Sequence, residues 1–308
     1  MKTVGWTGVY PAITTKFDEN DTLDFGTFLC NVTKQLEAGI HGLVLAGTLG
    51  EASTLSNDEK DELLQVTLEF VKDRIPVIMN VAEQTTKGAI DAAERATKIG
   101  ADGLMLLPPM RYKADSRETV TFFLEVAKST NLPIMIYNNP VDYGIEVTIE
   151  MFEELLKEDN IKAVKESTRD VSNIARLRNA FGDRVKILCG VDTVAMEELL
   201  LGADGWVAGL VSAFPRETVA IYELVKAGRI QEATKIYRWF MPLLELDLHP
   251  KLVQYIKFAE VATGLGSEIV RPPRLPLADE ERERIKSILR KATDNMPVLP
   301  KLKQTNLV

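Results

Sequence analysis

Residues 76–107 read PVIMNVAEQTTKGAIDAAERATKIGADGLMLL, and this stretch contains the pattern that decides the fold. It opens and closes with short, mostly apolar runs, Pro76–Val81 and Gly103–Leu107. Such runs are typical of strands that are buried on both faces, as in a parallel sheet. The residues between the two runs have helical periodicity. The stretch therefore predicts a strand, a helix and a second strand parallel to the first.

The same unit recurs along the chain. Eight strands, each followed by a helix, predict a (β/α)8 barrel, which is an α/β fold. An open doubly wound sheet is the competing class, but the count of eight and the lack of a GxGxxG turn after the first strand disfavour it. The other strand candidates are Val9–Thr14, Gly42–Ala46, Pro133–Asn138, Ile161–Lys165, Val185–Cys189 and Gly205–Ala208.

This alternation stops after about Gly228. The stretches Arg229–Asp247, Lys251–Thr263 and Asp279–Ala292 then predict three helices. We therefore expect a catalytic barrel over residues 1–228 and a helical C-terminal extension over residues 229–308. A helical extension of this kind more often supports assembly than chemistry.

Composition limits the classes of function. The net charge of −8 and the pI of about 5.1 argue against a nucleic-acid partner. No apolar stretch approaches the ~20 residues that span a bilayer, and the first residues lack the apolar region of a signal peptide, so a cytoplasmic protein is expected. Cys30 and Cys189 are far apart, and His41 and His249 are too few for a metal cluster. We expect neither a disulfide nor a metal site.

In a barrel, catalytic residues lie at the carboxyl ends of the strands and in the loops beyond them. Lys165 ends the run Ile161–Lys165 and is expected to point into a dry site. Desolvation favours the neutral amine of lysine, which is the form that attacks carbonyls and imines. From its position alone, an ion pair with a carboxylate such as Glu166 explains Lys165 equally well.

Two more features favour the nucleophile. Tyr137 ends the neighbouring strand, where a phenol can relay protons to and from the Lys165 amine; a core tyrosine with a satisfied hydroxyl is the alternative. The loop Gly47–Glu51 has two glycines, can present backbone N–H groups to a carboxylate, and adds the hydroxyl of Thr48. Together these groups predict an enzyme that forms a Schiff base with a small 2-oxo acid or cyclic imino acid.

Three motifs, Gly47–Glu51, Tyr137–Pro140 and Lys165–Ser167, occur in this order at the predicted strand ends. In this combination, and over nearly the whole chain, the sequence resembles the dihydrodipicolinate synthase / N-acetylneuraminate lyase family. The resemblance implies a (β/α)8 barrel, a homotetramer, and a Schiff-base lysine with no cofactor and no metal.

The same resemblance assigns roles to individual residues. It implies that Lys165 forms the imine and that Tyr137 shuttles protons. Thr48, with the amides of Thr48 and Leu49 next to Gly47, would hold the substrate carboxylate. The residues that would line the pocket near the amine are Val207 and Gly209.

Departures from the synthase pattern concern the substrate. The synthase branch has an arginine two residues after its Y-N-x-P motif, where it grips aspartate semialdehyde, but this chain has Asp142. Leu49 replaces a threonine of the glycine loop, and Met110 and Arg111 replace a pair of tyrosines, one of which reaches a neighbouring subunit. Four residues are gained as possible polar contacts: Asn80, Glu83, Arg111 and Asp142.

The stretch Leu107–Lys113, with Tyr137–Pro140, is similar to a subgroup of hydroxyproline breakdown, the 1-pyrroline-4-hydroxy-2-carboxylate deaminases. This similarity implies that Lys165 attacks C2 of the cyclic imine and that ammonia and 2,5-dioxopentanoate are released. Asp142 or Glu83 would hold the developing ammonium. The alternatives are a pyruvate-dependent aldolase for a 2-keto-3-deoxy sugar acid, a 4-hydroxy-tetrahydrodipicolinate synthase, and a catalytically silent ligand-binding barrel.

Overall fold

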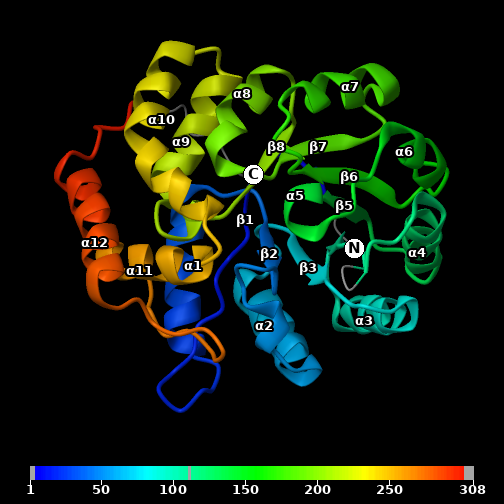
Figure 1. The fold of residues 1–308 in the computed structure, drawn as a ribbon, viewed down its shortest axis with the longest axis horizontal. Helices are drawn as coiled ribbons and strands as arrows, with labels where there is room; N and C mark the ends of the chain where they lie inside the picture. Colours follow the sequence, from blue (N-terminus) through cyan, green and yellow to red (C-terminus); the bar gives the residue numbers. More distant parts are fainter. Residues whose placement is uncertain (1–3, 110–111, 302–308) are drawn as a thin grey trace.

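A computed structural model describes residues 4–109 and 112–301 of the chain. Eight parallel strands follow one another around a barrel, with helices on the outside (Figure 1). The hydrogen-bonded order is β1-β8-β7-β6-β5-β4-β3-β2, and a single bridge between Ala12 and Val44 joins the two ends. The predicted (β/α)8 fold is therefore confirmed. The strands are β1 Gly8–Pro11, β2 Leu43–Leu45, β3 Val77–Val81, β4 Gly103–Leu106, β5 Ile134–Asn138, β6 Ile161–Glu166, β7 Lys186–Cys189 and β8 Gly205–Ala208.

All eight predicted strands are present, most with shifts of one residue at an end. The largest difference is in β1, which was predicted to continue to Thr14 but ends at Pro11. Beyond this point the chain turns to place Thr14 and Lys16 against Glu260, and the Thr14 hydroxyl donates to the Glu260 carboxylate over 2.6 Å. Polar contacts with the C-terminal extension thus replace strand pairing at this end of β1.

The helices that cover the barrel have well-defined ends. Ser56 and Glu59 form a capping box at the start of α2, and Asp115 and Glu118 form another at the start of α4. The helices are α1 Phe25–Ala38, α2 Asn57–Val71, α3 Thr86–Ile99, α4 Ser116–Lys128, α5 Pro140–Tyr143, α6 Ile149–Leu155, α7 Ser172–Phe181, α8 Ala195–Leu200 and α9 Pro215–Lys226. Short 3-10 helices occur at η1 Ala52–Thr54, η2 Asp192–Val194 and η3 Leu210–Ser212.

The C-terminal extension consists of α10 Ile230–Leu244, the 3-10 helix η4 Glu245–Leu248, α11 Leu252–Thr263 and α12 Asp279–Asp294. In Figure 1, α10 lies beside α9, and α12 lies at the outer edge of the molecule. The three predicted helices are all present, although α10 ends three residues earlier than predicted and continues as η4. Among the described residues, no helix has the length and apolar character needed to cross a membrane.

Side chains of each strand alternate between two hydrophobic cores. Ile136 and Val164 point outward into the core between the strands and the surrounding helices. Met135, Tyr137 and Ala163 point into the barrel, where they join a smaller core. Because strand residues two apart share a face, Lys165 follows Ala163 into the barrel interior. Tyr137 and Lys165 are paired in register, so the fold places them side by side.

Candidate active site

A cavity opens at the carboxyl ends of the strands, where the barrel fold is expected to hold its chemistry. It brings together residues from β5, β6 and β8 and from the loop after β2. The predicted site residues that line it are Gly47, Thr48, Leu49, Tyr137, Asp142, Lys165, Val207 and Gly209. Lining residues that the sequence did not single out include Tyr143, Arg169, Asp247, Leu248 and Leu252.

Lys165 is 6% exposed, and its Nζ lies 4.1 Å from the centroid of the Tyr137 ring. Burial lowers the pKa of Lys165, although the negative charges of Asp247 and Asp192 act in the opposite direction. The amine is therefore biased toward its neutral, nucleophilic form. Among the described residues, none forms a salt bridge with Lys165.

Glu166 does not pair with Lys165. Its carboxylate is fully buried on the other side of β6, where it accepts hydrogen bonds from Asn138 Nδ2 (3.2 Å), Asn173 Nδ2 (2.9 Å) and the Thr168 backbone N–H (2.8 Å). The alternative explanation of Lys165, an ion pair with Glu166, is therefore wrong. Successive strand residues face opposite sides, and this alternation separates the two groups.

Three hydroxyl groups lie together beside the lysine. The Thr48 hydroxyl and the Tyr143 phenol are 2.8 Å apart, and the Tyr143 and Tyr137 rings meet edge to face with centroids 5.4 Å apart. Burial raises the pKa of Tyr137 to about 12, while hydrogen bonds from Asn139 and Tyr143 act to lower it. Both phenols therefore stay protonated near neutral pH, and the three groups can pass protons along one path.

Tyr143 was missed from the sequence, yet a local signal for its position exists. Asn139 caps α5, Pro140 occupies its first turn, and Gly144 ends it with φ of 73°. Proline at the start and glycine just past the end are typical of a helix. This single turn carries Tyr143 back over Tyr137.

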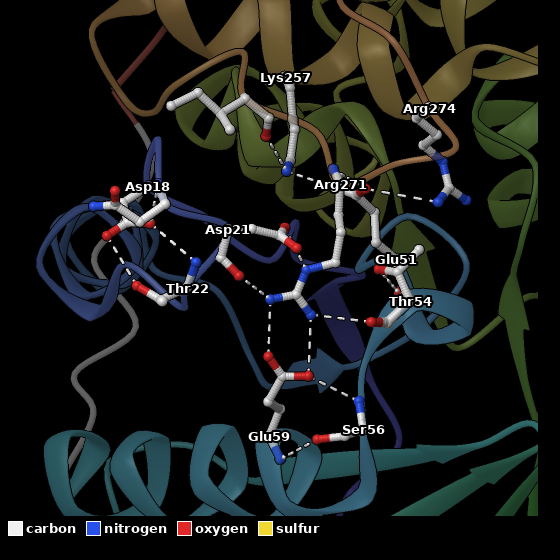
Figure 2. Close-up of polar contacts among 12 residues, drawn as sticks. Asp18, Asp21, Thr22, Glu51, Thr54, Ser56, Glu59, Lys257, Arg271 and Arg274 are labelled. Carbon is white, nitrogen blue, oxygen red and sulfur yellow. Dashed lines mark hydrogen bonds and ion pairs between the residues drawn. The ribbon is translucent and has the colours of Figure 1, made fainter.

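The glycine loop is held from behind by the C-terminal extension (Figure 2). Glu51 has a positive φ of 55° and a fully buried carboxylate, which lies 2.5 Å from Lys257 Nζ of α11. The carboxylate also accepts the backbone N–H of Arg271 at 3.1 Å. The sequence motif thus uses Glu51 to fix the loop, and Thr48 is left free to face the cavity.

Arg271 extends this anchor to helix α2. Its guanidinium contacts both carboxylate oxygens of Glu59 at 3.0 and 2.8 Å, and it donates to Asp21 at 2.8 Å (Figure 2). Such two-point contacts between a guanidinium and a carboxylate are strong and geometrically specific. Residues from opposite ends of the chain therefore set the position of the Thr48 loop.

Three carboxylates surround the lysine. Asp192 accepts from Trp206 Nε1 (2.8 Å) and from the Leu210 backbone N–H (2.9 Å). Asp142 accepts from Asn139 Nδ2 at 2.7 Å and lies 3.7 Å from Arg169. Asp247, from η4, is the third carboxylate. The expectation that the extension supports assembly more than chemistry therefore needs correction, because Asp247, Leu248 and Leu252 line the cavity.

Other predicted contacts lie elsewhere. Among the described residues that line the cavity, neither Asn80 nor Glu83 appears. Asn80 donates its amide N–H to the Ala46 carbonyl at 2.9 Å, and Glu83 forms an ion pair with Lys60 at 3.2 Å. These contacts hold both side chains to neighbouring elements, while Asn80 Oδ1 has no hydrogen-bond partner among the described residues. Arg111, also predicted to bind substrate, lies outside the described residues.

A barrel with a desolvated lysine beside a phenol at the carboxyl ends of its strands defines the class I lyases, which act through a Schiff base. The chain belongs to the Dihydrodipicolinate synthetase family, whose sequence model matches residues 5–292. It is 33% identical over 273 residues to the 4-hydroxy-tetrahydrodipicolinate synthase of Exiguobacterium sibiricum, an alignment that covers 88% of this chain and 91% of the relative.

Solved structures agree with this assignment. The 4-hydroxy-tetrahydrodipicolinate synthase of Methylacidiphilum fumariolicum SolV superposes with a TM-score of 0.89 at 30% identity, covering 94% of this chain and 96% of the other. YagE of E. coli K12, a family member solved in complex with pyruvate, superposes with a TM-score of 0.88 at 26% identity, covering 93% and 98%. The fold and the family are thus established over nearly the whole chain.

Proposed function

We propose that this enzyme forms a Schiff base between Lys165 and a small 2-oxo or 2-imino acid. The observation that carries the proposal is the desolvated Lys165 amine, 4.1 Å from the Tyr137 ring centroid in the cavity at the barrel mouth. The pyruvate bound to the related YagE supports a 2-oxo acid as ligand. The lysine itself acts as the electron sink, so the proposed reaction uses no further cofactor.

The surrounding residues suggest how the substrate is held and how protons move. The carboxylate of the substrate would bind the backbone N–H groups of Thr48 and Leu49, as expected for a glycine-rich turn. The neutral Lys165 amine then attacks C2. Protons lost from the amine and gained by the departing group pass through Tyr137, Tyr143 and Thr48. All members of this path belong to one chain.

For the particular substrate, we propose 1-pyrroline-4-hydroxy-2-carboxylate. Lys165 Nζ bonds to C2, and the C2–N bond of the ring breaks with its electron pair moving to nitrogen, which leaves as a tethered amine. Loss of a C3 proton gives an enamine that expels the 4-hydroxyl as water. A proton shift from C5 to C3 then gives an enamine at C4–C5, and gain of a proton at C4 with loss of one from nitrogen converts it to an imine at C5. Hydrolysis at C5 and at C2 releases ammonia, 2,5-dioxopentanoate and free Lys165, with one water consumed overall.

The presence of Asp142 in the cavity wall favours a substrate other than aspartate semialdehyde. An anionic side chain at this position disfavours a second carboxylate, which the synthase reaction requires. Arg169, which also lines the cavity, lies 3.7 Å from Asp142 and offsets part of its negative charge. The curated relatives are nevertheless named 4-hydroxy-tetrahydrodipicolinate synthases, so synthase activity is the second candidate for the reaction of this enzyme. Cleavage of a 2-keto-3-deoxy sugar acid is a third reaction that the same lysine could support.

Glu83 pairs with Lys60 at 3.2 Å, so its carboxylate would have to exchange this partner to hold the ammonium. Asp142 remains at the cavity wall but is engaged by Asn139. A homotetramer remains a proposal that sedimentation equilibrium would test. One relative in the comparison is described as a monomeric dihydrodipicolinate synthase variant.

The test measures ammonia and 2,5-dioxopentanoate from 1-pyrroline-4-hydroxy-2-carboxylate, together with irreversible inactivation by borohydride in the presence of pyruvate. Wild-type enzyme should give both products in equal amounts and should be trapped. Lys165→Ala should lose both properties. Lys162→Ala is the matched control, because Lys162 is an exposed lysine of the same strand. Trapping that survives Lys165→Ala would refute the assignment of Lys165 as the nucleophile. Trapping of wild type without turnover would refute the deaminase reaction and favour the synthase or aldolase reaction.

A further inference from the structure

We propose that Asp247, contributed by the C-terminal extension, selects substrates that carry a hydroxyl or amine group beyond C2. This inference rests on the proposed Schiff-base function of Lys165. It adds to that function a residue that binds the reacting end of the substrate chain, while the Thr48 loop binds the carboxylate. Asp247 lies in η4, Glu245–Leu248, about eighty positions after the lysine in sequence, and both residues line one cavity.

The carboxylate of Asp247 fits into the cavity because residue 209 is a glycine. A Cβ atom placed on Gly209 would lie 2.5 Å from Asp247 Oδ1 and 3.0 Å from its Cγ. Real Cβ atoms do not approach other atoms so closely, so any larger residue at position 209 would displace the carboxylate. Gly209 follows β8, and its missing side chain is the space that the acid occupies. The extension therefore supplies one wall of the substrate cavity.

Asp247 differs from the other two carboxylates near Lys165. Asp192 accepts hydrogen bonds from an indole N–H and from backbone N–H groups, and Asp142 accepts one from Asn139 and lies near Arg169. Asp247 accepts no hydrogen bond from any described residue, and no described cation lies within ion-pair distance of it. Asp247 is half-buried, and it lines the cavity without a hydrogen-bond partner from the described part of the chain. A polar group of the substrate is the partner that the cavity geometry allows.

The charges around Asp247 suit this role. Burial raises the pKa of Asp247 to about 8, and the negative charge of Asp192 adds to the effect, while Lys165 opposes it. Near neutral pH the carboxyl can therefore carry a proton, which it can donate to a hydroxyl group, or it can ionise beside an ammonium. When Lys165 becomes a positively charged Schiff base, the ionised form is favoured further. Leu248 and Leu252 provide apolar surroundings at the same wall.

The experiment measures how well small acids compete with isotope-labelled pyruvate for borohydride trapping, read by mass spectrometry as the loss of the labelled pyruvate adduct on Lys165. One pair of compounds, 2-oxopentanoate and 4-hydroxy-2-oxopentanoate, differs only by a hydroxyl group. A second compound, 1-pyrroline-2-carboxylate, presents the ring nitrogen without a hydroxyl. Asp247→Asn and Asp247→Leu are compared with wild type and with Glu245→Gln, an exposed acid on the same short helix. Circular dichroism confirms that each variant is folded.

In Asp247→Leu, binding of the hydroxylated or nitrogen-containing compound should weaken about 10- to 100-fold, the loss expected for a hydrogen bond to a charged group. Binding of 2-oxopentanoate and of pyruvate should weaken less and to the same extent, because both lose only the charge that Asp247 places near Lys165. Loss with only one of the two compounds identifies whether a hydroxyl or a nitrogen is recognised. Equal binding of all compounds, or equal losses that include pyruvate, would overturn the inference. Failure of wild type to be trapped at all would instead refute the Schiff-base proposal.

Discussion

Lys257→Met tests whether the buried ion pair behind the glycine loop holds it in place. The substitution keeps most of the side-chain length and removes the charge. It leaves the Glu51 carboxylate buried without its closest cation, and it leaves the Ile269 carbonyl without the donor that now lies 2.6 Å away. Removal of one partner of a buried ion pair is expected to cost about 3–5 kcal/mol, and Arg274, 3.6 Å from Glu51, remains as a more distant cation (Figure 2).

This cost should appear in thermal and urea unfolding. For a chain of this size, 1 kcal/mol corresponds to roughly 2 °C in Tm, so Lys257→Met should unfold about 6–10 °C lower than wild type. The pyruvate concentration for half-maximal trapping should rise as well, because the Thr48 loop loses its support. The control is Lys251→Met, which removes an exposed lysine of the extension paired with Glu281 and should cost less than about 1 kcal/mol.

Glu51→Gln in the Lys257→Met background separates the charge from the packing. The double variant no longer buries a carboxylate that has lost its closest cation, and its amide oxygen can still accept the Arg271 N–H. It should therefore recover at least about 1 kcal/mol of the loss. A Lys257→Met variant as stable as wild type, or a double variant whose losses simply add, would refute the assigned role of the pair.

Three further changes should have measurable effects. Tyr143→Phe should lower kcat about 100-fold or more by breaking the hydroxyl path to Thr48, with little change in pyruvate binding; an unchanged kcat would remove Tyr143 from the path. Gly190→Ala places a Cβ 2.8 Å from Lys165 Cγ and should abolish trapping, whereas Gly5→Ala meets no close atom and should be neutral. Burial raises the pKa of Glu198 to about 8, so wild type binds an extra proton when folded and should lose roughly 2–5 kcal/mol of stability between pH 4.5 and 8. Glu198→Gln should flatten this dependence in urea unfolding measured at both pH values; equal slopes would contradict it.

The barrel strands could be predicted because burial on both faces demands continuous apolar runs, and such runs are visible in one sequence. Lys165 and Tyr137 could be predicted for the same reason, since each is a polar residue that ends such a run. The alternative of a Lys165–Glu166 ion pair is wrong because both residues lie in β6, and consecutive residues of a strand face opposite sides of the sheet.

The residues that were missed depend on contacts that are distant in sequence or on side-chain direction. Asp247 comes from a short 3-10 helix whose position depends on how the extension packs against the barrel, and no local pattern specifies that packing. Asn80 lies within β3 and Glu83 follows it, but their contacts with Ala46 and Lys60 could not be identified from strand position. Only Tyr143 had a readable local signal, in the proline and glycine that bound α5.

The anchor on Glu51 has a consequence for the order of synthesis. The Arg271 N–H that binds its carboxylate lies 220 positions further along the chain. At about 5–20 residues per second, roughly 10–40 s pass between the emergence of the acid and the arrival of this donor. During that interval all the strand residues around Thr48 have been synthesised, but the Glu51 carboxylate has to stay in contact with water because Lys257 and Arg271 are not yet present. A ribosome-bound chain stalled before α11 should therefore expose the Gly47–Glu51 loop to proteases. Synthesis through Arg271 should protect the loop.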